Sequence, residues 1–306
     1  MKWKGYYLEY LSSIALYGLS LVVVKIIAAL LRLHPAVMKT MLLLYCGYIL
    51  LAPGYYRFLA KEVNHTSHSV WRALLQFLRG QKPSRENINA LLFLAVKIFF
   101  LPLMLSFLLQ NTQALFSDYQ EYALLLTVIF TIDTFIFTLG YTFESSILQN
   151  KVKSVEPTLL GWLVTLVCYP PLNDIVGKYL PWPANEYVFF WNDSLTWLFQ
   201  AAIIILLLLY LSATMALGTK ASNLTNRGIV AKFPYSIVRH PAYASKVLVW
   251  WITLLPVISL LAVLVMVFWT LIYYLRAITE ERHLRADAEY QQYMRKVSWK
   301  FIPGIW

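Results

Sequence analysis

The chain has few of the features that soluble enzymes carry. Charged residues make up only 13% of its 306 residues, whereas hydrophobic residues make up 59%. Its two cysteines, Cys46 and Cys168, lie in separate apolar stretches without the spacing of a metal site, so we expect two packed thiols. The sequence has no glycine-rich phosphate loop, internal repeat or low-complexity tract. The low share of charged residues and the high share of hydrophobic ones exclude an ordinary soluble domain.

Long hydrophobic runs fill most of the chain. Eight approach or exceed the roughly 18 residues typical of a membrane-spanning helix, and they lie near residues 8–31, 37–52, 88–110, 121–143, 158–180, 195–217, 244–258 and 260–279. The run 158–180 is the weakest because Pro170-Pro171 interrupts it. The last two runs are joined around Pro256, which indicates a tight helical hairpin. We therefore expect an all-α, polytopic membrane protein with about eight transmembrane helices.

Basic residues are distributed unevenly among the connecting loops. With the N-terminus in the cytoplasm, the opposite side receives only Arg32, Lys39 and Lys178, and all other loop lysines and arginines are cytoplasmic. The positive-inside rule thus predicts that both termini are cytoplasmic, in a bacterial inner membrane or the endoplasmic reticulum. The net charge of +11 then matches anionic membrane lipids. Because no basic segment is interleaved with aromatic residues in a polar context, we expect no nucleic-acid partner.

Two further features, one at the membrane interface and one within a predicted span, complete this description. Residues 69–79 have apolar side chains at helical spacing and flanking arginines, which predicts an amphipathic helix at the membrane interface. Among the charges within or at the ends of the spans, Asp133 lies deepest, well inside the run 121–143. Charges in lipid need partners. We favour a structural ion pair between Asp133 and Lys97, and the alternative is that Asp133 faces a substrate cavity.

The first of three C-terminal motifs is Arg239-His240-Pro241-Ala242-Tyr243. Proline disfavours helical geometry at His240 and suits the first turn of a helix. The new helix begins with free N–H groups and a positive dipole end, which suit a carboxylate or phosphate. A basic, aromatic membrane anchor is the alternative interpretation.

The second motif, Arg276-Ala277-Ile278-Thr279-Glu280-Glu281, ends the last apolar run. Acidic residues at a helix C-terminus oppose its dipole, at a cost of about 0.3–1 kcal/mol each. Arg276 stands four residues before Glu280 and can pair with it along one face. Either the helix continues into solvent with its charges solvated, or the pair serves a site. Because the intervening chain forms a hairpin, both motifs can converge at its mouth.

The ordered set of motifs resembles the isoprenylcysteine carboxyl methyltransferase and phospholipid methyltransferase superfamily of integral-membrane enzymes. The resemblance covers roughly residues 222–306, and its further pieces are Asn226-Arg227-Gly228, Pro234-Tyr235, Tyr290-Gln291-Gln292-Tyr293 and Phe301-Ile302-Pro303. It divides the chain into a membrane helical region without an assigned family, 1–217, and a methyltransferase-like catalytic region, 218–306. Lys246 departs from the pattern, since many members have a small residue soon after the tyrosine. It either serves substrate binding or extends to the lipid headgroups.

The resemblance implies a binding site for S-adenosylmethionine, without a metal. The implied cofactor-binding residues are Tyr235, His240, Tyr243, Arg276, Glu280 and Glu281, and the implied catalytic residues are Arg239, His240 and Glu281. Carboxylates suit the ammonium and ribose of this cofactor, and Arg276 or Arg239 suits its carboxylate. Aromatic faces such as those of Tyr235, Tyr243 and Trp250 suit the sulfonium.

The implied reaction methylates a lipophilic acceptor that enters from the bilayer, such as a prenylcysteine carboxylate or a lipid amine. A carboxylate needs no base, whereas an amine or hydroxyl needs one, for which His240, Glu281 and a tyrosine are candidates. One alternative is an NADPH-dependent sterol-type reductase, which has a similar Arg-His-Pro block and a tail similar to residues 303–306. The acidic pair would repel the 2′-phosphate of NADPH. Another alternative is a receptor or transporter, whose polar residues would line a continuous pore.

Overall fold

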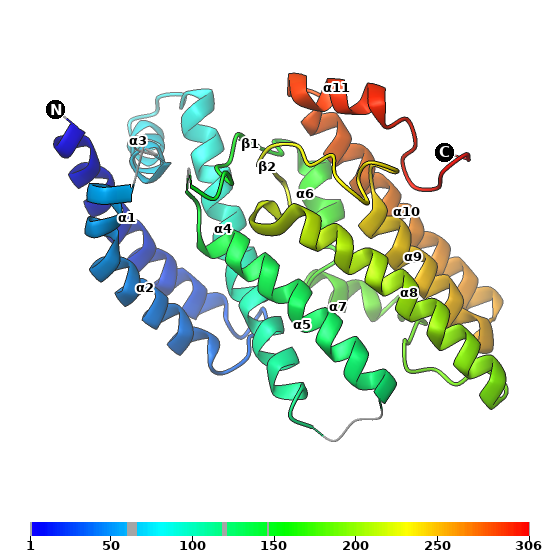
Figure 1. The fold of residues 1–306 in the computed structure, drawn as a ribbon. Helices are drawn as coiled ribbons and strands as arrows, with labels where there is room; N and C mark the ends of the chain where they lie inside the picture. The colour runs from blue at the N-terminus through cyan, green and yellow to red at the C-terminus, as the bar shows by residue number, and fades with distance from the viewer. Residues whose placement is uncertain (1, 60–65, 118–120, 146, 306) are drawn as a thin grey trace.

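The computed structural model describes residues 2–59, 66–117, 121–145 and 147–305. Within these ranges the chain is helical apart from a ribbon of two very short strands (Figure 1). The expected all-α fold is confirmed. Part of the basic loop between Arg57 and Arg85, and Trp306 at the end of the tail, lie outside the described residues.

Six described helices are long and apolar enough to cross a membrane, which makes the protein a multi-pass membrane protein. They are α1 (Lys2–Ile27), α2 (Val37–Gly54), α4 (Arg85–Ala114), α5 (Glu121–Thr142), α8 (Asp193–Leu217) and α10 (Leu260–Leu284). A seventh helix, α9 (Pro241–Leu254), is apolar but shorter, and a 3₁₀ turn, η3 (Leu255–Val257), follows it. Ser259 caps α10 by accepting a hydrogen bond from the N–H of Ala262. The predicted hairpin before residue 279 is therefore formed by α9 and α10.

The predicted span 158–180 is not one membrane helix, so the described chain has fewer long helices than the eight expected. It forms α6 (Leu159–Leu166) and α7 (Leu172–Gly177), separated by a turn that contains Pro170-Pro171. Proline lacks the N–H that a helix needs and clashes with the preceding turn. An eight-residue helix rises only about 12 Å, which is less than half of a bilayer core. The chain nevertheless passes from the end of the bundle near β1 to the end where α8 begins (Figure 1).

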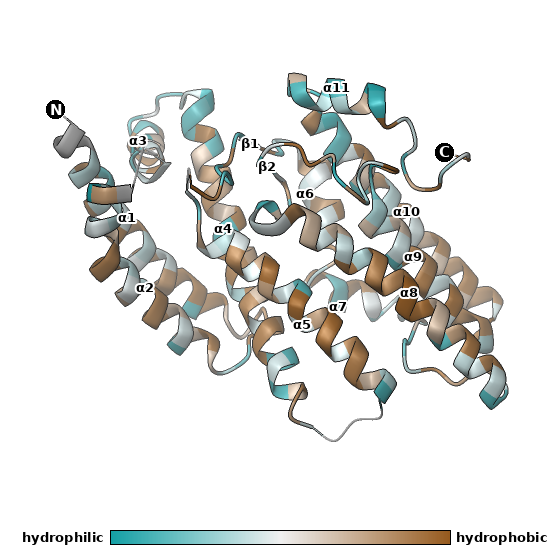
Figure 2. Cartoon of the chain, viewed as in Figure 1, coloured by the Kyte–Doolittle hydropathy of each residue, from teal (hydrophilic) through white to brown (hydrophobic). Residues whose placement is uncertain are grey.

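Polar elements gather at one end of the bundle. The strands β1 (Ser154–Val155) and β2 (Thr225–Asn226) pair antiparallel there, with Ser154 opposite Asn226. The start of α1, the helix α3 (Thr66–Leu78) and the C-terminal helix α11 (Ala288–Lys296) lie at the same end (Figure 1). Hydrophilic colours concentrate here, whereas brown runs along the middle of the long helices (Figure 2). The helix predicted at 69–79 is confirmed as α3.

The first helical hairpin has mostly exposed apolar side chains, as expected for contact with lipid. Only 17% of the apolar window of α1 and of α2 is buried, against 44% for α4. Side chains such as Ile26 and Leu50 are largely exposed. The core therefore lies in the second part of the bundle, where α5 packs between α4 and α8, and α9 packs between α8 and α10.

Gly140 allows a close approach that helps to position the site. A side-chain Cβ at this position would lie 2.6 Å from the carbonyl oxygen of Ala221. The chain that leaves α8 therefore crosses directly over the end of α5. Any larger residue at 140 would push apart α5 and the segment that leads to the Arg-His-Pro motif.

Candidate functional site

The Arg-His-Pro motif forms the start of α9. Pro241 is its first residue, where a missing N–H has no cost, and His240 stands just before the helix. The backbone N–H groups of Arg239 and His240 donate to the carbonyls of Trp299 (3.0 Å) and Lys300 (2.8 Å). The C-terminal tail therefore holds the start of α9 in place.

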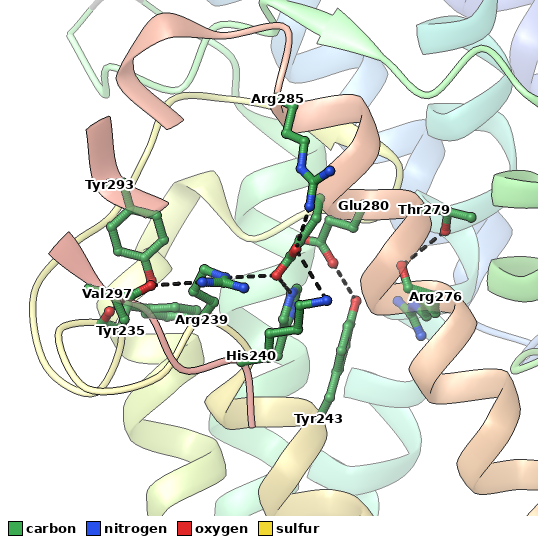
Figure 3. Close-up of polar contacts among 12 residues, drawn as sticks. Tyr235, Arg239, His240, Tyr243, Arg276, Thr279, Glu280, Arg285, Tyr293 and Val297 are labelled. Carbon is green, nitrogen blue, oxygen red and sulfur yellow. Dashed lines mark hydrogen bonds and ion pairs between the residues drawn. The ribbon is translucent and has the colours of Figure 1, made fainter. Parts of the chain in front are cut away.

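Glu281 is the centre of a buried ion-pair network beside that start, and it is only 1% exposed. Its Oε1 accepts a hydrogen bond from Nε of Arg239 (2.8 Å) and lies 3.2 Å from Nε2 of His240. Its Oε2 lies 3.5 Å from Arg285 and 3.8 Å from Lys300. Figure 3 shows Arg239 and His240, from the segment that leads into α9, and Arg285, which directly follows α10, converging on one another. We call these five residues the Glu281 network.

Arg239 extends this network to the C-terminal tail. Its Nη1 donates to the carbonyls of Val297 and Ser298, both at 2.8 Å. A buried charge pair stabilises a fold only when its remaining hydrogen-bonding groups also have partners. Nε and Nη1 of Arg239 both donate hydrogen bonds, whereas Oε2 of Glu281 has no hydrogen bond and only the cations of Arg285 and Lys300 within 4.0 Å. The network consequently joins α9, α10 and the tail into one unit.

Glu280 faces a different direction from its neighbour, because successive residues of a helix are rotated by about 100°. Its Oε2 accepts a hydrogen bond from the hydroxyl of Tyr243 at 2.8 Å (Figure 3). The Tyr243 ring stacks on the His240 ring, with centroids 5.4 Å apart and planes at 7°. The acidic pair is thus divided between the network, which holds Glu281, and the adjacent cavity, which Glu280 lines.

Arg276 is a buried cation in the wall of the same cavity, with 6% of its surface exposed. Its Nη2 donates to the side-chain oxygen of Asn223. The guanidinium carbon lies 5.1 Å from the ring centre of Tyr243. The predicted pair with Glu280 is not formed, since each residue has another partner. Among the described residues no carboxylate lies within 4.0 Å of Arg276.

The cavity has a volume of about 350 Å³, within the range of roughly 300–1,000 Å³ that is common for small-molecule sites. Six of the seven predicted site residues line it: Tyr235, Arg239, His240, Tyr243, Arg276 and Glu280. The seventh, Glu281, does not. Trp250 is also not in the lining, because its ring packs edge-on against Trp182 (4.5 Å) and Tyr273 (4.8 Å). In the described part of the chain no His, Cys, Asp or Glu cluster is arranged for a metal ion.

Asp133, in the middle of α5, lines the same cavity. Its Oδ2 accepts a hydrogen bond from the hydroxyl of Tyr210 (2.8 Å), and its Oδ1 accepts one from Thr214 (2.6 Å). The predicted ion pair with Lys97 is wrong. The ammonium of Lys97 instead lies against the rings of Phe93 and Tyr17, at 5.4 and 5.5 Å from their centres, on the side of α4 that faces α1.

Several cavity residues were missed by the sequence reasoning. Tyr210 and Thr214 stand four residues apart in a run of leucine and isoleucine, so they share one face of α8. That spacing was the available signal that α8 presents hydroxyl groups to a polar partner. Asn223 and Tyr169 gave no such signal, since they lie in turns between helices.

The Asn226-Arg227-Gly228 motif lies outside the cavity and ties its surroundings together. Nη1 of Arg227 donates to the carbonyl of Gly140 at 2.7 Å. The side chains of Asn226 (2.9 Å) and Lys153 (3.0 Å) donate to the carboxylate of Asp287. Although burial acts to raise the pKa of Asp287, these hydrogen bonds hold it below its ordinary value. The motif thus joins α5, the strand ribbon and the start of α11.

The comparison with protein families agrees with this geometry. Residues 195–290 match the family model described as phospholipid methyltransferase. The matched part runs from α8 through α9 and α10 to the first turn of α11, so it includes all seven predicted site residues. No curated protein matches the chain. Residues 195–290 therefore carry a phospholipid methyltransferase domain, part of the superfamily that also contains the isoprenylcysteine methyltransferases, and this domain supports a membrane methyltransferase function.

Proposed function

We propose that the protein transfers a methyl group from S-adenosylmethionine to a lipophilic acceptor in the cavity between α5, α8, α9 and α10. The observation that carries this proposal is that Arg276 and Glu280, which line one cavity, have only uncharged hydrogen-bond partners among the described residues. A zwitterionic ligand satisfies both. When bound, the cofactor supplies an electrophilic methyl group on its sulfonium.

The donor set of the cavity fits this cofactor. The guanidinium of Arg276 has no carboxylate partner among the described residues, so it is available for the carboxylate of the amino-acid group. Glu280 suits the ammonium or a ribose hydroxyl, and it has one hydrogen-bond partner, Tyr243. The rings of Tyr235 and Tyr243 line the space between these charges and suit a sulfonium.

The Glu281 network positions this set. Arg239 and Glu281 hold His240, whose ring in turn stacks on Tyr243. We accordingly assign Glu281 to positioning rather than to direct contact with the cofactor. Methyl transfer depends mainly on holding the acceptor atom about 3–3.5 Å from the methyl carbon and in line with the sulfur, so a rigid cradle accelerates it.

The apolar part of the cavity suits the tail of a lipophilic acceptor. Met104, Phe107, Phe130, Phe137 and Leu217 line it, from helices α4, α5 and α8. A pocket with a polar end and apolar walls binds an amphiphile with its head fixed and its tail in contact with hydrocarbon.

We also propose that both chain ends face the cytoplasm. The start of α1 and the helix α11 lie at one end of the bundle (Figure 1), where the basic residues also concentrate. The cofactor then enters from the cytosol and the acceptor from the bilayer. Labelling of single cysteines placed near both ends of the chain tests this orientation, and opposite accessibilities would contradict it.

Binding calorimetry tests the proposed function. We expect detergent-purified protein to bind S-adenosylhomocysteine and to show no heat of binding with NADPH. Arg276→Gln should weaken S-adenosylhomocysteine about tenfold or more, because a charge-assisted hydrogen bond is lost. Binding of NADPH with no binding of S-adenosylhomocysteine would overturn the methyl-donor assignment and favour a reductase.

A further inference from the structure

Asp133 is a carboxylate held open toward the cavity. It is 6% exposed and lies halfway along α5. Each of its oxygens accepts one hydrogen bond from a hydroxyl of α8, from Tyr210 or from Thr214. A carboxylate offers about four acceptor positions, so these two bonds leave about half of its capacity free. The carboxylate lines the cavity.

Connection of α5 to α8 does not require a charge at this position. An amide or hydroxyl would accept hydrogen bonds from Tyr210 and Thr214 at much lower cost, because a carboxylate inside a membrane is expensive. Within the described ranges no lysine, arginine or histidine lies within 4.0 Å of Asp133. The charge of Asp133 is therefore not neutralised by a direct ion pair. Asp133 differs from a residue that only joins two helices because it also lines the cavity.

Lys246 is the other charged group at this depth of the cavity. Its ammonium lies 5.8 Å from the ring centre of Tyr210 and 5.6 Å from that of Trp250. The two ring faces attract this cation. Lys246 thus has aromatic partners in the cavity wall, whereas the two hydrogen bonds of Asp133 come from hydroxyl groups alone.

Asp133 comes from a different part of the chain than the residues that we assign to the cofactor, although it lines the same cavity. It stands nine residues before Thr142, the last residue of α5, so the helix places it roughly 13 Å from that end. It also lies outside the matched methyltransferase domain, which begins at residue 195. The cavity therefore has a charged group from α5 in addition to the charged groups of the α9–α10 hairpin.

We propose that Asp133 binds the head of the acceptor and selects acceptors that carry a proton on the nucleophilic atom, an amine or a hydroxyl, over carboxylates. This inference rests on the proposed function. An N–H or O–H group donates to the free positions of Asp133, whereas a carboxylate acceptor has no proton to donate and is repelled. The group that determines the acceptor is then contributed by α5 and not by the family domain.

For an amine the step balances as follows. A protonated amine binds to Asp133 and passes one proton to a carboxylate oxygen, which frees the nitrogen lone pair. That lone pair forms the bond to the methyl carbon while the carbon–sulfur bond breaks, and the electron pair of that bond stays on sulfur. The product leaves as a methylated ammonium, and Asp133 returns its proton to water.

The test compares three probes with the same saturated sixteen-carbon tail: hexadecylamine, hexadecanol and hexadecanoate. Binding to the detergent-purified protein is measured with S-adenosylhomocysteine present, and methyl transfer is measured with S-adenosylmethionine. The wild type should bind the amine and the alcohol at least tenfold more tightly than the carboxylate. The opposite preference would overturn the inference and would assign the acceptor site to Lys246.

Two variants separate acceptor binding from a structural role. Asp133→Asn should weaken hexadecylamine at least tenfold, with the affinity for S-adenosylhomocysteine unchanged. Thr214→Val removes a hydrogen bond of the α5–α8 contact but keeps the carboxylate, so it should retain amine binding within about threefold. Equal losses of amine binding and of thermal stability in both variants would reduce Asp133 to a helix contact. If the wild type fails to bind S-adenosylhomocysteine, the proposed function itself fails, whatever the acceptor preference.

Discussion

Two polar regions of this membrane protein use charge in opposite ways. In the Glu281 network, three cationic side chains and a histidine lie within 4.0 Å of one carboxylate. Along the neighbouring cavity, Asp133, Lys246, Arg276 and Glu280 have no oppositely charged side chain within that distance among the described residues. Hydroxyls, an amide and aromatic rings are their partners instead.

From this difference we infer which charges stabilise the fold and which are available to a ligand. A buried carboxylate with several cationic partners is compensated internally, and removal of one member leaves an uncompensated charge. A charged side chain whose partners are all neutral recovers only part of its lost hydration energy. It can therefore still pair with a ligand of opposite charge. The first region should therefore respond to substitution in stability, and the second in affinity.

The largest effect on stability is expected from Glu281→Gln. It leaves Arg239 buried without its counter-ion, at a cost of about 3–5 kcal/mol, so the melting temperature should fall further than in any other variant discussed. Glu289→Gln is the matched control, because that side chain is 65% exposed and pairs with Lys153 at the surface. An unchanged melt combined with a lost affinity for S-adenosylhomocysteine would mean that Glu281 contacts the cofactor directly.

An intermediate effect is expected from Glu280→Gln, and on affinity rather than stability. Loss of a charge-assisted hydrogen bond, worth about 1.5–3 kcal/mol, should weaken S-adenosylhomocysteine roughly ten- to hundredfold. Tyr243→Phe, which removes only the hydroxyl that donates to Glu280, should have a smaller effect. Calorimetry with a parallel thermal melt measures both. A large fall in melting temperature without a change in affinity would remove the distinction between the two acidic residues.

The smallest effect on stability is expected at Asp287, whose carboxylate connects the start of α11 to the strand ribbon by hydrogen bonds to Asn226 and Lys153. Its pKa is lowered in the folded protein, so its contribution to stability is present above its unfolded pKa of about 3.9 and is lost as the pH falls through the lower folded value. Asp287→Asn should lower the melting temperature slightly at pH 7, by at most about 1 kcal/mol, and make it less sensitive to acid. Melts at pH 7 and near pH 3 measure this, and a variant with an unchanged acid sensitivity would contradict it.

The sequence by itself determined the elements and most of the site. Apolar run lengths located α1, α2, α4, α5, α8 and α10, because helix formation in a membrane depends mainly on the length and composition of each segment. Pro241 marked the start of α9. The hairpin of two adjacent runs was enough to predict that the Arg-His-Pro motif and the acidic pair converge, since antiparallel neighbours joined by a tight turn have few other arrangements.

Only the tertiary structure decided which partner each buried charged side chain has. Whether Glu281 or Glu280 faces the cavity depends on the rotation of α10 and on the position of the tail that carries Lys300, which no local pattern contains. Asp133 finds its partners on α8, a helix more than sixty residues further along the chain, because α8 packs against α5. Lys97 instead faces α1, away from Asp133. A buried charge takes whichever partners the packing of the helices brings within hydrogen-bond distance, and this choice is made between helices rather than within them.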